Sequence, residues 1–260
     1  MDWEATLVLR IQTHLRAHHP KFMTQNNFFI KGFTLVEIAI VLIIVGFLVA
    51  AFLAPLTAQI DQKNNSETRR LIDDSKEALM GYAMSNKHLP CPDKTSGANN
   101  GPNDNPNDGL EDFDALTGNC IVYDGNLPWA TLSLPNTDSW QQPLIYHVTV
   151  SFAQRAPLNT FGLGTFGNLK VCDIANCSGI TYATTAVAVL VSRGKNRGIC
   201  STLPSPPACK DERANDDGNN IFVSHVPTAS GSANGEYDDL TTWVSSNVLL
   251  NRMVTSGQLP

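Results

Sequence analysis

Six cysteines are the residues of this 260-residue chain whose types and spacing most directly indicate chemistry. An even number of cysteines in a chain that leaves the cytosol indicates disulfides, although sequence alone does not choose among the connectivities. We expect sequential pairing because each pair closes a loop rich in turn residues: Cys91–Cys120, Cys172–Cys177 and Cys200–Cys209. The alternative is a zinc site, which the absence of a close CxxC pair and of His at ligand spacing disfavours.

Oxygen ligands for calcium are the second chemistry that the sequence offers. Residues 91–120 are dense in Asn, Asp, Gly and Pro, so we expect a loop there. An EF-hand alignment fails, because placing Gly109 at the invariant glycine puts Pro106 at a ligand position and Ala115 at the bidentate Glu position. The other interpretation is a solvated acidic loop held by a disulfide. Its candidate ligands are Asp104, Asn105, Asp108, Glu111, Asp112 and Asp114.

A long apolar run precedes these loops and must position them. Between Phe33 and Leu56 only Glu37 is charged. A helix of this length spans about 36 Å, enough to cross a hydrocarbon core of about 30 Å. No small-residue cleavage site follows the run, so ordinary signal peptidase is not expected to remove it. The sequence therefore predicts a transmembrane helix over residues 33–56.

The entrance to this run resembles a known processing site. Lys31-Gly32-Phe33-Thr34-Leu35-Val36-Glu37 is similar to the cleavage site of type IV prepilins and type II secretion pseudopilins. The resemblance implies cleavage after Gly32 by a prepilin peptidase and methylation of the new amine of Phe33. It also implies that Glu37 pairs with the N-terminal amine of a neighbouring subunit, since two charges that are costly in lipid become tolerable when paired.

The predicted organisation follows from these features. Residues 1–32 are a leader, and a start at Met23 would shorten it to ten residues, 23–32. Residues 33–56 are the transmembrane and assembly helix. Residues 57–88 continue as an amphipathic helix, since apolar positions recur there at helical spacing. Residues 89–260 form an extracytoplasmic head with strands over 144–150, 186–191 and 239–244, and a closing helix over 246–254 capped by Ser246. The fold class is α+β, with the long helix packed on a small antiparallel sheet and disulfide-held loops.

Two stretches of the head resemble the major pseudopilin of type II secretion. Residues 138–146 are similar to its Asp-x-Trp-Gly-x-Pro-x-x-Tyr stretch, with Gln141 at the position of the Gly. Residues 192–196 and 235–243 are similar to two loops whose acidic residues bind calcium in that family. The resemblance implies a calcium site with Asp238, Asp239 and Asn196 as ligands, and calcium is the one cofactor for which it offers candidate ligands.

The composition narrows the function. Residues 33–260 carry 14 Lys and Arg against 22 Asp and Glu, a net charge of −8, which argues against general nucleic-acid binding. No hydrolase, P-loop or zinc-protease motif occurs, so we expect no enzyme. We expect a structural subunit, minor or specialised, of a type IV pilus or type II secretion pseudopilus. The alternative is a filament-tip module that binds a surface, DNA or a secreted protein.

The same interpretation defines partners and location. The expected partners are other pilin or pseudopilin subunits, the prepilin peptidase and methyltransferase, an inner-membrane assembly platform, and lipid before assembly. We expect a single-pass inner-membrane protein with a periplasmic head, which then enters the filament.

Overall fold

The computed structural model describes residues 32–101, 103–155, 161–197, 209–229 and 231–259, without the side chains of residues 51–56. The chain divides between Ala51 and Phe52 into two compact units, and each is considered by itself. Helices in the described residues are α1 (Leu35–Asn86), α2 (Val150–Ala153), α4 (Lys210–Ala214) and α5 (Ser246–Thr255). The leader through residue 31, including the Met23 start, lies outside the described residues.

The predicted transmembrane helix is wrong. Within the described residues, no helix combines the length and the hydropathy that crossing a membrane requires.

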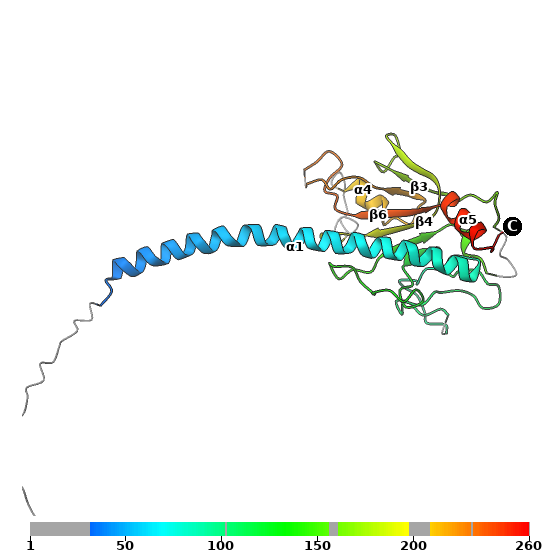
Figure 1. Cartoon of the computed structure of the whole chain (residues 1–260), viewed down its shortest axis with the longest axis horizontal. Coiled ribbons are helices and arrows are strands. Elements are labelled where there is room, and N and C mark those ends of the chain that lie inside the picture. Colours follow the sequence, from blue (N-terminus) through cyan, green and yellow to red (C-terminus); the bar gives the residue numbers. More distant parts are fainter. Residues whose placement is uncertain (1–31, 102, 156–160, 198–208, 230, 260) are drawn as a thin grey trace, which may run out of the picture. The chain divides into compact units, whose positions relative to one another are not determined.

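The sheet is mixed, so the predicted antiparallel sheet is also wrong. Among the described residues, the strand order is β1-β2-β4-β3-β5, and β6 also pairs with β4. The pair β3–β5 is parallel, whereas β1–β2, β2–β4, β3–β4 and β4–β6 are antiparallel. The broader α+β class is confirmed (Figure 1). The strands are β1 (Asp124–Asn126), β2 (Ile145–Val148), β3 (Leu169–Cys172), β4 (Thr181–Ser192), β5 (Ile221–Val223) and β6 (Leu240–Ser245).

Alternation along β2 and β4 divides the apolar side chains between the two faces of the sheet. Tyr146 and Leu190 belong to a large core on one face, whereas Ile145 and Val189 belong to a smaller core on the other. Successive side chains of a strand point to opposite faces, which is why neighbours in sequence enter different cores. Strand β2 and residues 186–192 of β4 are buried on both faces, as their β-branched composition predicts.

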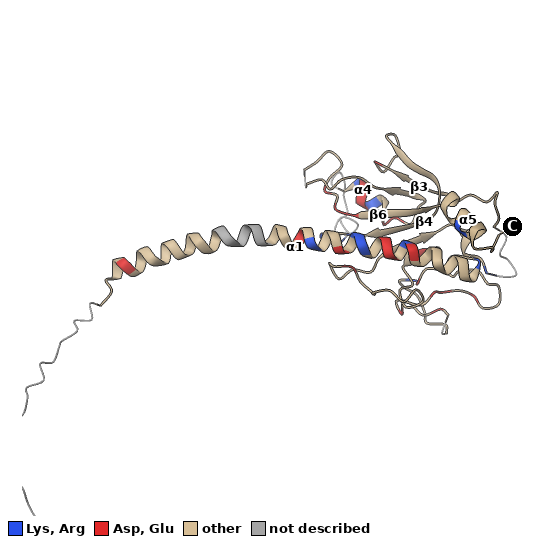
Figure 2. Ribbon diagram, viewed as in Figure 1, with Lys and Arg blue, Asp and Glu red and all other residues tan. Residues whose placement is uncertain are grey.

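The second half of α1 covers the larger core. Ile72, Leu79, Met80 and Ala83 recur at helical spacing and are buried against it. Figure 2 shows charged residues gathered along this half of the helix, on its remaining surface. The helix ends at Asn86, and Pro90 and Pro92 lie just beyond it.

Helix α5 closes the same core at the end of the chain. Its N-cap is Ser245, whose side chain accepts a hydrogen bond from the N–H of Val248. The predicted cap, Ser246, is instead buried, and its hydroxyl donates to Thr185 O at 2.6 Å. Gly257 has φ +73° just past the helix, as expected for its C-terminal end.

Candidate functional site

The predicted processing segment begins the described part of the chain. Thr34 and Glu37 form a reciprocal cap on α1. Glu37 Oε2 accepts from the N–H and the hydroxyl of Thr34, both at 2.8 Å, and Thr34 Oγ1 accepts from the N–H of Glu37 at 3.2 Å. This capping box satisfies backbone donors that the first helical turn leaves without partners. The two hydrogen bonds from Thr34 lower the pKa of Glu37.

Apolar side chains are exposed all along the first part of α1. Phe33 is 79% exposed and Leu35 86%, and exposure remains near half as far as Val49. A helix that is apolar on every side is normally buried within a larger structure. Without another structure packed against it, this segment therefore exposes an apolar surface that is normally buried. Its large exposed side chains are Phe33, Leu35, Val36, Ile38, Ile40, Val41, Leu42, Ile43, Ile44, Val45, Phe47, Leu48 and Val49.

Two of the three predicted disulfides are confirmed. Cys91 pairs with Cys120, and Cys172 pairs with Cys177. For the third pair, Cys209 is disulfide-bonded, whereas Cys200 lies outside the described residues.

A cluster of three carboxylates lies where residues 192–196 and 235–243, the two loops that resemble calcium-binding loops, come together. Glu212, Asp238 and Asp239 each offer one oxygen, and these atoms all lie within 4.8 Å of one another. Asp239 and Glu212 are buried, with 4% and 3% of their surface exposed. Three carboxylates held this closely in a buried place repel one another, so a divalent cation would stabilise them.

Each carboxylate in this cluster has one oxygen held by a donor and one without a partner. Glu212 Oε1 accepts from the N–H of Asp238 at 3.0 Å, and Asp238 Oδ2 accepts from the N–H of Asn196 at 2.9 Å. Asp239 Oδ2 accepts from Asn215 Nδ2 at 2.9 Å. The opposite oxygens, Glu212 Oε2, Asp238 Oδ1 and Asp239 Oδ1, are buried without a hydrogen-bond partner.

The electrostatics of the cluster agree with this geometry. Burial, together with the charges of Asp238 and Glu236, raises the pKa of Glu212 to about 7. Burial also raises the pKa of Asp238 and holds that of Asp239 well above its usual range. Burial therefore disfavours the charged forms of these carboxyl groups. A bound Ca²⁺ ion, which prefers oxygen ligands, would instead favour the charged forms.

The sheet register explains how residues so distant in sequence meet. Ser192 pairs with Leu240 where β4 ends and β6 begins, so the turn after β4 lies beside the segment before β6. Gly194 has φ +60°, and a Cβ there would lie 2.4 Å from Asp238 O and 2.5 Å from Asp238 Oδ1. Only glycine allows Asp238 to approach this closely.

Residues 138–146, the stretch that contains Trp140, form hydrogen bonds with the turn after β4. Asp138 Oδ2 accepts from the hydroxyl of Ser192 at 2.6 Å, and Ser192 Oγ accepts from the N–H of Gly194 at 3.2 Å. Asp138 Oδ1 accepts from the N–H groups of Trp140 and Gln142 at 2.9 and 3.0 Å. The three segments that the sequence singled out therefore form one connected structure.

The sequence-predicted ligands meet in this cluster, and one further residue joins them. Asn196 lies beside them, where its Nδ2 also donates to Glu212 Oε1 at 2.7 Å. Its role as a ligand, like those of Asp238 and Asp239, stays a prediction. Glu212 was missed, because it lies in a five-residue helix within the stretch 197–234 and no ligand spacing marks it. The adjacent Cys209 was the one signal that this segment is held in place.

The carboxylates of the loop 91–120 instead hold the loop itself together. Asp112 accepts from the N–H groups of Lys94 and Asn105 at 2.8 and 2.9 Å, and Asp104 pairs with the Lys94 ammonium. Among the described residues, the carboxylates that lie close enough together to hold a metal ion are those of Glu212, Asp238 and Asp239.

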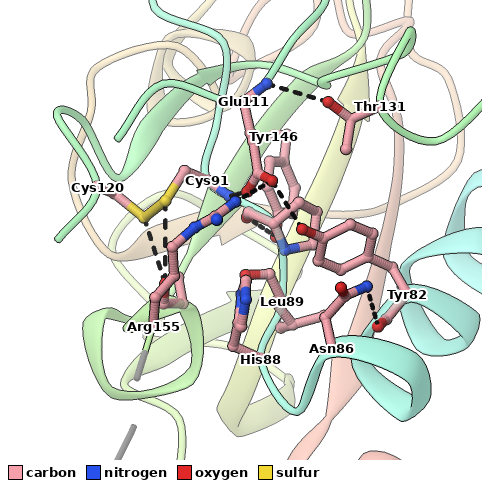
Figure 3. Close-up of polar contacts among 12 residues, drawn as sticks. Tyr82, Asn86, His88, Leu89, Cys91, Glu111, Cys120, Thr131, Tyr146 and Arg155 are labelled. Carbon is pink, nitrogen blue, oxygen red and sulfur yellow. Dashed lines mark hydrogen bonds and ion pairs between the residues drawn. A yellow bond between two sulfur atoms is a disulfide. The ribbon is translucent and has the colours of Figure 1, made fainter. Parts of the chain in front are cut away.

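Glu111 anchors this loop to the end of α1 (Figure 3). Its Oε1 accepts from the Tyr82 hydroxyl at 2.7 Å and from the Arg155 guanidinium, and its Oε2 accepts from the N–H of Cys91 at 3.1 Å. The Arg155 guanidinium also lies 3.5 Å from the centre of the Phe113 ring. The disulfide loop is thus joined to α1 and to the segment after α2.

Comparison with family models, with curated proteins and with solved structures found no match for this chain. The functional argument therefore depends on the residues and contacts described above.

Proposed function

We propose that this chain is a subunit of an extracytoplasmic helical filament, in which the first part of α1 is buried among copies of itself. Within that class, we propose a pilin-like subunit of a type IV pilus or type II secretion pseudopilus. It would be cleaved after Gly32, methylated at Phe33 and assembled helix to helix, with the head on the outside.

One observation carries the proposal: the apolar side chains of α1 are exposed on every side from Leu35 to Val49. Such a surface is much larger than a typical apolar patch on a monomer. Packing against the same segment of neighbouring subunits would bury it, because each copy presents matching apolar faces.

The charge at Glu37 supports copies of this chain as the partner. Cleavage after Gly32 would place a new positive amine on Phe33. A neighbour's Glu37 would then offer the complementary negative charge within an otherwise apolar bundle, where pairing offsets the cost of burying either charge. The sequence has no other charge between Glu37 and Asp61, so this pairing would also set the stagger between subunits.

The carboxylate cluster adds a second component to the proposal. We propose that Glu212, Asp238 and Asp239 hold a calcium ion that stabilises the head. Bound cations stabilise a fold by mass action, and a head that works outside the cell meets calcium at high concentration.

Intact mass and N-terminal sequencing test the processing step. The chain should be isolated from cells with and without a prepilin peptidase. We expect an N-terminus at methylated Phe33 in the first case and an uncleaved chain in the second. An intact junction between Gly32 and Phe33 in both strains would contradict the proposal, because the amine that pairs with Glu37 would never form.

A further inference from the structure

The Cys172–Cys177 disulfide closes a short loop that contacts the helix beside the carboxylate cluster. Within that loop, the N–H of Ala175 donates to Asp211 Oδ1 at 2.8 Å. Asp211 is 2% exposed and immediately precedes Glu212 in α4. The disulfide loop therefore contacts the helix that carries the ligand missed by sequence analysis.

A second set of contacts joins the same loop to Asp238. Ala175 packs against a small core formed by Ala214, Val223 and Tyr237. Tyr237 precedes Asp238, and its hydroxyl donates to Val223 O at 2.8 Å. Through this small core, the disulfide loop is connected to the segment that carries Asp238.

His225 closes a third connection. Its Nε2 lies 3.4 Å from Asp211 Oδ2, and its ring stacks on Tyr237 with ring centres 3.9 Å apart. Asp211 is thus held between the Ala175 N–H and the His225 ring. Because α4 has only five residues, it depends on such tertiary contacts for its position.

We propose that the Cys172–Cys177 disulfide, acting through Asp211, positions Glu212 for the cation, so that the oxidised chain binds a divalent cation more tightly than the reduced chain. A dithiol supplies the two electrons and two protons that convert the disulfide into two thiols, and it forms its own disulfide. The freed loop no longer fixes the Ala175 N–H against Asp211, and α4 loses one of the contacts that hold it in place. This inference rests on the proposed cation site.

Calcium titration of the purified full chain in mild detergent tests the inference, with affinity measured by calorimetry. The variant pair is Cys172→Ala with Cys177→Ala, and the matched control is Cys91→Ala with Cys120→Ala. We expect the first double variant to raise the Kd about tenfold, the effect of losing one hydrogen bond to a charged group. The control, whose disulfide lies among the contacts of Figure 3, should keep the wild-type Kd.

A second variant guards against loss of folding in the first. Asp211→Ala keeps both described disulfides and removes the acceptor of the Ala175 N–H, so its Kd should also rise about tenfold. A wild-type Kd in either Asp211→Ala or the Cys172–Cys177 double variant would overturn the coupling while leaving the cation site intact. Absence of calcium binding in the wild-type chain would instead overturn the cation site itself.

Discussion

The backbone N–H of Asn196 donates a 2.9 Å hydrogen bond to Asp238 Oδ2 across 42 residues of sequence. This contact joins the turn after β4 to the segment before β6. It fixes one oxygen of Asp238, whereas the other, Oδ1, is buried without a hydrogen-bond partner.

Replacing Gly194 should abolish the effect of calcium on stability. In Gly194→Ala, the new Cβ would meet Asp238 O and Oδ1 at 2.4 and 2.5 Å, and the carboxylate must move. Calcium at a hundred times its Kd should stabilise the wild-type chain by about 2.7 kcal/mol, and this gain should vanish in the variant. Thermal unfolding with and without calcium measures it. Gly162→Ala is the control, because its Cβ would meet no atom within 4 Å.

Replacing Gln141 with glycine should stabilise the chain. Gln141 has φ +63°, the left-handed region that costs a side chain energy and that glycine adopts freely. Gln141→Gly should therefore stabilise the chain by about 0.5–1 kcal/mol, seen as a rise in the unfolding midpoint. Its neighbour Gln142 lacks a positive φ, so Gln142→Gly should lower stability. Equal shifts for both variants would contradict the strain at Gln141.

Acid should destabilise the head through His147. Burial lowers the pKa of His147 to about 4, below the usual value of 6.5. Its contribution to stability is present above pH 6.5 and is lost as the pH falls towards 4, because the unfolded chain binds the proton first. The loss reaches about 3 kcal/mol over that window. Denaturant unfolding of His147→Gln should show a flatter dependence on pH, whereas a curve parallel to the wild type would exclude His147 as the cause.

Removing Glu111 should destabilise the disulfide loop strongly. Glu111→Ala leaves the half-buried Arg155 guanidinium without its carboxylate, which should cost about 3 kcal/mol. Tyr82→Phe removes only one hydrogen bond to the same carboxylate and should cost about 1–2 kcal/mol. Denaturant unfolding compares the two. If Tyr82→Phe costs as much as Glu111→Ala, the Arg155 charge is not what makes Glu111 important.

Glu37 can be tested with its capping role kept intact. Gln also serves at this position of a capping box, so Glu37→Gln should keep the start of α1 while removing the charge. If the charge pairs with a neighbour's Phe33 amine, incorporation into filaments should fall in Glu37→Gln nearly as far as in Glu37→Ala. Sheared filament yield measures this. Normal yield in Glu37→Gln with loss in Glu37→Ala would assign Glu37 to helix capping alone.

The parts of the fold that depend on local pattern were predictable. The β-branched runs located β2, β4 and β6, and the turn-rich segments between cysteines located two disulfides. The parallel pair β3–β5 was not predictable, since β5 is three residues long and its pairing is decided by contacts distant in sequence. The cap of α5 was misplaced by one residue because the Ser246 hydroxyl is occupied by Thr185 O.

The residues of the candidate site likewise include some that the sequence could predict and one that it could not. Asp238 and Asn196 belong to turns that a sequence pattern can mark, whereas Glu212 reaches the cluster only through tertiary packing of α4. The transmembrane prediction for residues 33–56 was based on a count of apolar residues, and within the described residues no helix meets the requirements of length and hydropathy.

The ion pair between Glu77 and Arg252 has a consequence for biosynthesis. Arg252 donates to both carboxylate oxygens of Glu77, at 2.6 and 3.0 Å, across 175 residues. The large core likewise contains both Ile72 and Met253, so it cannot close before nearly the whole chain has been made. At about 5–20 residues per second, a ribosome needs about 10–35 seconds to cover that separation. During this interval the large core remains incomplete, so apolar residues of the head such as Ile72 have no core to enter.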